Sequence, residues 1–438
     1  MGTRQKPLFD ALKYKDFQWI WASQTAHAFA LWAQMVALPL LVLEITDNSA
    51  AHLGGVIAVR TIPSLLLGPW AGVVADWFNR RTILIFTKWA NLVLSIVIAV
   101  LVASGIVELW HVYAWMFMRG ATQVFDQPAR YSMIPSILPS HLVTQGMALL
   151  SSTQNFMRII GATLAGFIAE YFGLSWTFIV IAITAATGLM ATYQIHVAAN
   201  ERAGTAGIKG MTRGLIEGAK FSVRNRTIRG VLIISLIYFT FGMSFMQVFA
   251  PLFAVKVLEI GRDGLGMMLA LTGGGALVAS LIVARVQPTR LGLILPITVV
   301  SIGAALALFS ASTYLPRPMG LFLPLALVTI IGASQTLFMS LSRAVMVKAA
   351  PADMRGRVLA FISMDRAMMA AGGAVGGILS AIYGAQPIQI VFGLTCVVGG
   401  TLAFIFLREL RQFRMIDEDG EEKPTATQPQ ATGSQVAD

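Results

Sequence analysis

Long apolar runs alternate with short polar segments along the whole chain, and this spacing predicts helices that cross a membrane. An α-helix of about 20 residues spans the roughly 30 Å hydrocarbon core of a bilayer. Runs of about that length occur six times in each half of the chain. We therefore predict an all-α integral membrane protein with twelve transmembrane helices. The runs begin near Trp19, Leu53, Ile83, Trp110, Leu142, Trp176, Val231, Leu265, Leu291, Leu321, Val358 and Ile388.

The second half of the chain repeats the first at an offset of about 212 positions. At this offset Gly54 falls on Gly266, and Gly161 falls on Gly373. Internal repeats of this length are typical of transporters in which two related bundles hinge about a site at the bilayer midplane. The predicted helices therefore form two pseudo-symmetric six-helix bundles with a cavity between them.

The polar segments divide the chain into four parts. We predict an N-terminal bundle at residues 1–200, a cytoplasmic linker at 201–226 and a C-terminal bundle at 227–414. Residues 415–438 are first acidic and then polar, so they cannot bury enough apolar surface to fold. This last part is predicted to be a disordered cytoplasmic tail.

Composition and charge agree with a membrane protein and predict its orientation. Apolar residues make up 56% of the chain and charged residues 12%, against about 25% charged in soluble proteins. With a cytoplasmic N-terminus, twenty-five of the 32 Lys and Arg residues lie in inside segments, and only Lys256, Arg262 and Arg317 lie outside. This is the positive-inside pattern, so both termini are predicted to be cytoplasmic. The net charge of +11 then indicates contact with anionic lipids, and no nucleic-acid partner is expected.

Motifs for other chemistry are missing from the sequence. There is no phosphate-binding Gly-rich loop with Lys and Ser or Thr, so an ATP-driven pump is not indicated. The five histidines are scattered and there is one cysteine, which predicts neither a metal nor another cofactor. The sequence also shows no Ser, His and acid arrangement of the kind that forms a nucleophile motif, so an enzyme is not indicated. The charged start of the chain also lacks the pattern of a cleaved signal peptide.

The loop between the second and third runs combines a glycine, an aspartate, a turn and two arginines. Gly72 permits close helix contact, and the arginines orient the chain in the membrane. This segment resembles the signature loop of the major facilitator superfamily, and the resemblance implies a conformational switch. Asparagine stands where that family usually has glycine, and we expect the turn to survive because asparagine tolerates left-handed backbone geometry. The alternative is that the basic residues of this loop only orient the protein in the membrane. The residues are Gly72, Asp76, Asn79, Arg80 and Arg81.

Two further segments resemble the drug-exporter branch of that superfamily, which contains siderophore and macrolide efflux proteins. They are residues 125–130, followed by Pro135 and Pro139, and residues 355–358. The resemblance implies export from the cytoplasm driven by proton exchange. We expect the substrate to be a small amphiphilic molecule of the drug, macrolide or siderophore class, moved by alternating access. We also expect a monomer. The alternatives are a facilitator or importer of a small metabolite and a receptor or scaffold that transports nothing.

Charged residues within the predicted helices are candidates for the transport site, because a buried charge in a membrane costs several kcal/mol unless it is paired or faces water. Arg119 lies near the midplane, and Asp126 and Arg130 follow on the same helix face, so the three can form a ladder. Arg119 also matches an arginine that the superfamily often carries in its fourth helix. The ladder either belongs to the transport site or only holds neighbouring helices together. The other charged candidates are Arg60, Arg158, Asp365 and Arg366.

A polar stripe in the first run indicates a face that looks into a cavity. Gln24, His27 and Gln34 are spaced so that they share one side of a helix. His27, Asp126 and Asp365 are the candidate proton carriers, although a lone histidine is also common as a simple hydrogen-bond donor.

The charge inside the predicted membrane region is biased toward positive. Four arginines stand against two aspartates there, and this excess favours an anionic or phenolic substrate. Neutralisation by lipids or by acids at the membrane boundary is the alternative.

Overall fold

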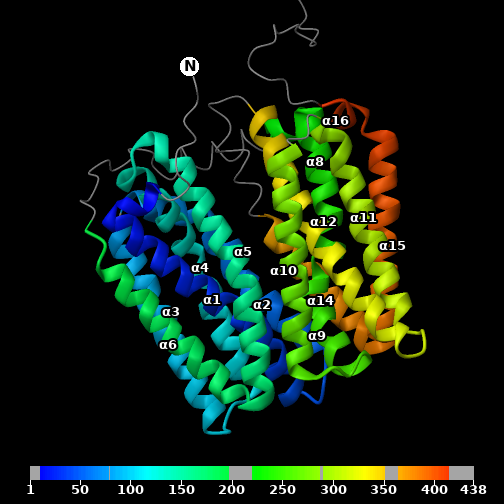
Figure 1. Ribbon diagram of the computed structural model, residues 1–438, viewed down its shortest axis with the longest axis horizontal. Helices are drawn as coiled ribbons and strands as arrows, with labels where there is room; N and C mark the ends of the chain where they lie inside the picture. The colour runs from blue at the N-terminus through cyan, green and yellow to red at the C-terminus, as the bar shows by residue number, and fades with distance from the viewer. Residues whose placement is uncertain (1–9, 78, 197–219, 287–289, 351–363, 414–438) are drawn as a thin grey trace, which may run out of the picture.

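The computed structural model describes residues 10–77, 79–196, 220–286, 290–350 and 364–413. Within these ranges the chain forms helices and turns, with no strand, as Figure 1 shows. The expected tail at 415–438 lies outside the described residues. So does most of the expected linker, of which residues 220–226 are described.

The first group of helices packs around α1, which lies against α5 and α6. Helix α3 packs against α4 and α6, and α2 packs against α4. These six helices are the left-hand group in Figure 1. The bounds are α1 (Lys15–Ile45), α2 (Ala50–Trp77), α3 (Arg80–Ala103), α4 (Leu109–Ile137), α5 (Ser140–Tyr171) and α6 (Leu174–Tyr193), preceded by the short η1 (Asp10–Lys13).

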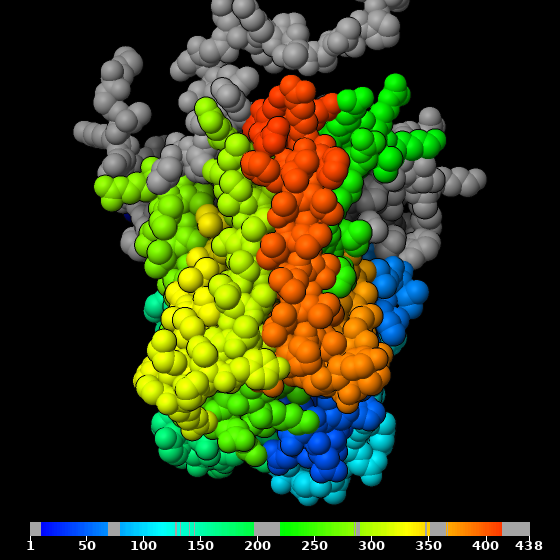
Figure 2. Space-filling model, turned by 90° about the vertical axis from the view of Figure 1, so that its right-hand side faces the viewer, coloured from blue at the N-terminus to red at the C-terminus, as the bar shows by residue number. Residues whose placement is uncertain are grey.

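The second group begins with a helix that contains several π-helical turns. It comprises α8 (Arg226–Ile237), η2 (Tyr238–Gly242), η3 (Phe245–Phe249), α9 (Ala250–Leu252) and η4 (Phe253–Val257). Helices α11 and α15 pack side by side on its outer face, as Figure 2 shows, and α12 packs against α10 and α11. The remaining bounds are α10 (Gly261–Val286), α11 (Leu291–Ser312), α12 (Met319–Ala349), α14 (Met364–Tyr383), α15 (Ala385–Phe406) and α16 (Arg408–Gln412).

The helices have the length and apolar surface of membrane spans. Among the described residues, nine helices are long and apolar enough to cross a bilayer. Helices α4 and α5 are also long enough, at 29 and 32 residues, and the apolar part of α14 is shorter, at Ala367–Tyr383. Large apolar side chains such as Phe86 and Phe406 are more than 70% exposed, as expected of a surface that faces lipid. The all-α membrane fold is therefore confirmed, whereas the total of twelve spans stays a prediction.

Glycines bring the two groups together near the end of the molecule that lies opposite α16 in Figure 1, which we name the outer end. Helix α2 meets α14 there, and a Cβ on Gly54 would lie 2.6 Å from the carbonyl oxygen of Gly373. Helix α5 meets α10, and a Cβ on Gly266 would lie 2.6 Å from the carbonyl oxygen of Ala162. Gly54 and Gly266 are repeat-related positions, so the two seams are related by the same pseudo-symmetry.

Candidate functional site

A cavity of about 210 Å³ lies between the two groups of helices. Its wall in the first group comes from α1, α2 and α4, and its wall in the second comes from the segment around η2 and η3 and from α14. Arg60 is the one charged side chain among the lining residues that the structure describes, and its Nη2 donates to Oε1 of Gln123 at 2.8 Å. The rest of the lining mixes neutral polar groups with apolar side chains: Leu31, Trp32, Met35, Ile57, Thr61, Ser64, Met243, Gln247 and Met369. A small molecule with a polar and an apolar part would fit such a surface.

Arg158 links the two groups at the edge of this cavity. Its Nη2 donates to Oγ1 of Thr272 at 2.7 Å and to Oε1 of Gln335 at 3.4 Å, so α5 is tied to α10 and α12. The guanidinium also lies 4.9 Å from the ring of Trp32, which lines the cavity. Arg158 is not among the lining residues and is only 7% exposed. It therefore lies behind the cavity wall and bridges the two groups.

A buried ion cluster occupies the interior of the first group. Nζ of Lys88 lies 3.0 Å from Oδ1 of Asp126, and Nη2 of Arg130 lies 2.9 Å from Oδ2 of Asp126. The three side chains are at most 5% exposed. Arg119 does not extend this arrangement, because its Nε donates to Gln34 and its Nη1 to Asn91, at 2.9 and 3.0 Å. The expected ladder therefore divides, and Asp126 is an ion-pair partner for two cations.

Lys88 was not among the charged residues expected within the helices. It lies within α3, on a buried polar face with Thr87, Asn91 and Ser95. The spacing of three and seven residues from Lys88 to Asn91 and Ser95 is the helical signal that could have revealed it. The count of buried charges is corrected accordingly: Lys88 and Arg130 are added to the cations of the first group.

The polar stripe of α1 faces the interior of its own group of helices and does not line the cavity between the groups. Gln24 donates to Gln154 at 3.3 Å, and Gln34 accepts from Arg119. His27 borders a separate cavity of about 20 Å³, together with Lys88 and Arg119. A space of this size holds about one water molecule. The expected cavity thus exists, but it is too small for a substrate.

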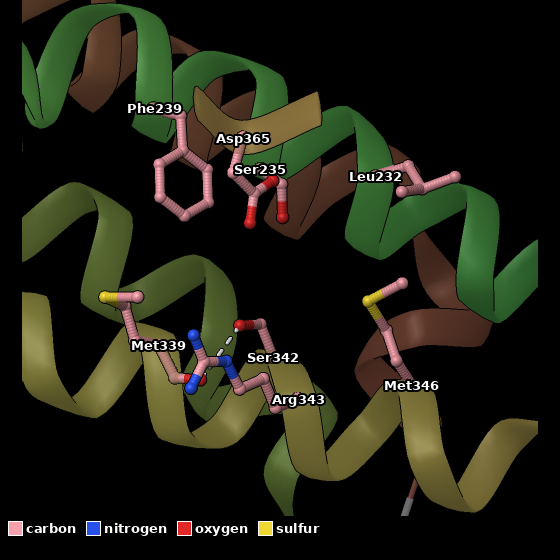
Figure 3. A pocket seen from close by; sticks show the side chains of 8 residues that line it. All are labelled: Leu232, Ser235, Phe239, Met339, Ser342, Arg343, Met346 and Asp365. Atoms are coloured by element: carbon pink, nitrogen blue, oxygen red, sulfur yellow. Dashed lines mark hydrogen bonds between the residues drawn. The ribbon is translucent and has the colours of Figure 1, made fainter. Parts of the chain in front are cut away.

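Asp365 lies in a different place, inside the second group. Figure 3 shows its carboxylate beside Ser235 of α8, with the guanidinium of Arg343 on the opposite wall formed by α12. The other residues around this small cavity are Leu232, Phe239, Met339, Ser342 and Met346. Arg343 was not among the sequence candidates. The side chain of Arg366, the neighbouring candidate, lies outside the described residues.

The predicted switch loop joins α2 to α3. Gly72 and Asp76 belong to the last turns of α2, and the side chain of Asp76 lies outside the described residues. Asn79 caps α3, since its Oδ1 accepts from the backbone N–H of Arg81 at 2.9 Å. Its φ of −58° is not left-handed, so our reason for the asparagine was wrong and capping replaces it.

The arginine pair of this loop lies at the start of α3. Nη2 of Arg81 donates to the carbonyl oxygen of Tyr193 at 3.0 Å, which ties α3 to the end of α6 in the same group of helices. Arg80 is also described, and it is the first residue of α3.

The described residues offer no metal centre. They contain no group of three or more His, Cys, Asp or Glu side chains that could hold an ion. Cys396 is buried in α15.

Comparison with known proteins gives consistent matches over most of the chain. A family described as transmembrane secretion effectors matches residues 7–432. The staphyloferrin A transporter of Staphylococcus aureus (strain NCTC 8325 / PS 47) is 22% identical over 385 residues, covering 88% of this chain and 94% of its own. An uncharacterised MFS-type transporter of Bacillus subtilis (strain 168), YvqJ, is 22% identical over 241 residues, covering 54% and 57%.

Solved structures share the fold at low sequence identity. The D-xylose–proton symporter has a TM-score of 0.71 at 15% identity, covering 91% of this chain and 99% of its own. The nucleoside transporter NupG has a TM-score of 0.65 at 13% identity, with coverages of 91% and 99%. At these identities the likeness shows the arrangement of helices alone.

Proposed function

We propose that this chain exports a small amphiphilic molecule in exchange for protons. It belongs to the transmembrane secretion effector family of major facilitator transporters, and it is therefore a membrane transporter and not an enzyme. The cavity between the two groups of helices carries this proposal, since both groups contribute to its wall. A site shared in this way can open to one side of the membrane and then to the other. The similarity to a staphyloferrin A transporter supports a substrate of the siderophore class.

The charge of the cavity favours a substrate with an anionic group. Arg60 lines the cavity, and the described lining residues include no carboxylate. Gln123 accepts a hydrogen bond from the guanidinium, which helps to position it on the cavity wall. Bidentate pairing of a guanidinium with a carboxylate or a similar anion is the strongest polar contact that this wall can offer. Arg119 and Arg158, by contrast, are not among the lining residues, and both donate hydrogen bonds to other protein side chains.

Arg60→Gln is expected to raise the KM of an anionic substrate about tenfold or more, since a hydrogen bond to a charged group contributes about 1.5–3 kcal/mol. Anionic compounds should compete for wild-type export, and lipophilic cations of similar size should not. Arg60→Lys keeps the charge and loses the bidentate geometry, so its KM should lie between those of the wild type and Arg60→Gln. Strong inhibition by cations and none by anions would contradict the proposed substrate charge.

The test of function is uptake into inverted vesicles, measured with and without an imposed proton gradient and over a panel of amphiphiles. We expect uptake that depends on the gradient. His27→Gln and Asp365→Asn test the coupling group, because Asp126 is occupied by two cations. Loss of gradient dependence in one variant with retained downhill flux would identify the carrier. Uptake indifferent to the gradient indicates a facilitator, and no flux of any compound indicates a receptor or scaffold.

Asp76→Asn is expected to leave membrane insertion unchanged and to slow transport about tenfold, which corresponds to a shift of about 1.4 kcal/mol between states. The physical reason is that a charge at the end of α2 would help to select one of the two orientations of the bundles. The initial rate of uptake, normalised to the amount of inserted protein, measures the effect. Transport at the wild-type rate would instead support an orientation signal.

We further propose two bundles at 1–200 and 227–414 with cytoplasmic termini, acting as a monomer in a cell membrane. The start of α1 and α16 lie toward the same end of the molecule in Figure 1, and the positive-inside pattern supports a cytoplasmic position for that end.

A further inference from the structure

The two seams between the groups of helices differ in charge although they match in packing. Both have a repeat-related glycine at the contact, Gly54 on α2 and Gly266 on α10. At the α5–α10 seam, Arg262 joins the two groups. Its repeat-related position at the other seam is Ala50, which packs through its carbonyl oxygen near Gly377.

Arg262 makes three kinds of contact across the α5–α10 seam. Its Nη2 lies 2.9 Å from Oε2 of Glu44 at the end of α1. Its backbone N–H donates to Oε2 of Glu170 at 3.0 Å, and its Nη1 donates to the carbonyl oxygen of Ala169 at 3.3 Å, both on α5. One residue of the second group thus holds two helices of the first, beside an outer cavity of about 420 Å³.

We propose that Arg262, Glu44 and Glu170 form an electrostatic latch that holds the outer end closed, and that this latch exists on only one of the two pseudo-symmetric seams. Opening of the outer end would have to break all three contacts, whereas closure at the cytoplasmic end leaves them intact. The repeat-related position of Glu170 is Ile382 and that of Glu44 is Lys256, so the α2–α14 seam has no matching acids. That seam depends on glycine packing.

The latch is partly exposed, which limits its strength and sets the size of the expected effect. The side chains of Arg262 and Glu44 are 37% and 54% exposed, and ion pairs of this kind contribute little to folding stability. A balance between two states of one folded protein responds to much smaller free energies than unfolding does. The latch can therefore bias the two states without being needed for folding.

Thiol labelling from the outside tests the latch without any transported substrate. Ile57 lines the cavity between the groups, so cysteine at this position is a reporter for opening of the outer end. Cys396, the single native cysteine, is buried, so the parent chain serves as the blank. A membrane-impermeant maleimide is added to right-side-out vesicles, and Ser104→Cys, exposed after α3, verifies that the outer end faces the reagent.

We expect Glu44→Gln to label about two- to fivefold faster than the reporter alone, the range set by exposed ion pairs. Arg262→Gln should label at least as fast, and the double variant should match Arg262→Gln because the two act through one contact. Glu259→Gln is the matched control, since Glu259 lines the same outer cavity but has no ion pair or hydrogen bond with Arg262 in the described structure. Equal labelling of Glu44→Gln and Glu259→Gln, or additive effects in the double variant, would overturn the latch and leave the proposed transport function untouched.

Discussion

Asp126→Asn is expected to lower the free energy of unfolding by about 3–5 kcal/mol, the cost of removing one partner from a buried ion pair. Asp126 is 1% exposed and faces both Lys88 and Arg130 at 3.0 Å or less. Its loss leaves two buried cations without their common anion. The measurement is the midpoint of thermal unfolding in detergent, followed by size-exclusion chromatography of the heated protein.

Lys88→Met provides the matched control for this prediction. The wild-type cluster has two cations and one anion, so removal of Lys88 leaves the Asp126–Arg130 pair balanced. We expect a change in the unfolding midpoint much smaller than that of Asp126→Asn, because methionine fills a similar volume without charge. The unfolding midpoint of the double variant should lie between the midpoints of Lys88→Met and Asp126→Asn. Equal damage from Lys88→Met and Asp126→Asn would show that shape, and not charge balance, holds α3 against α4.

The repeat was the most productive sequence signal, because it depends on many positions and not on one motif. Gly54 and Gly266 were paired by the offset alone, and the structure places each at a seam between the two groups of helices. Glycine is expected wherever two helix backbones approach closely in a membrane. The offset could not reveal which helices meet, since the partner of each seam is fixed by the packing of the whole fold.

The site was less predictable because charge counting along the chain ignores which side chains meet. Arg119, Asp126 and Arg130 share one face of α4, yet Asp126 pairs with Lys88 of α3 and Arg119 pairs with Gln34 of α1. Helical spacing identifies residues on one face, and only the neighbouring helices decide their partners. For the same reason Arg60 was one candidate among several, until the structure placed it alone among the described arginines in the cavity lining.

Gly266→Val is expected to prevent closure of the outer end and to reduce transport by about 5- to 150-fold, the range for a shift of 1–3 kcal/mol between states. A Cβ at Gly266 would lie 2.6 Å from the carbonyl oxygen of Ala162 and 3.0 Å from Cα of Gly166. These are backbone atoms of the other group of helices, so the clash is relieved by separating the groups at this seam. External labelling of the Ile57→Cys reporter should therefore become faster as transport falls.

Two other glycines separate this effect from simple loss of folding. A Cβ at Gly274 meets no atom within 4 Å, so Gly274→Val should transport and unfold like the wild type. A Cβ at Gly332 would lie 2.0 Å from the carbonyl oxygen of Thr272 within the same group of helices. Gly332→Val should therefore lower the unfolding midpoint, whereas Gly266→Val should keep it and change only the labelling and the transport. If Gly266→Val unfolded as readily as Gly332→Val, the α5–α10 seam would be part of a single fixed core, and the two groups would not move against each other there.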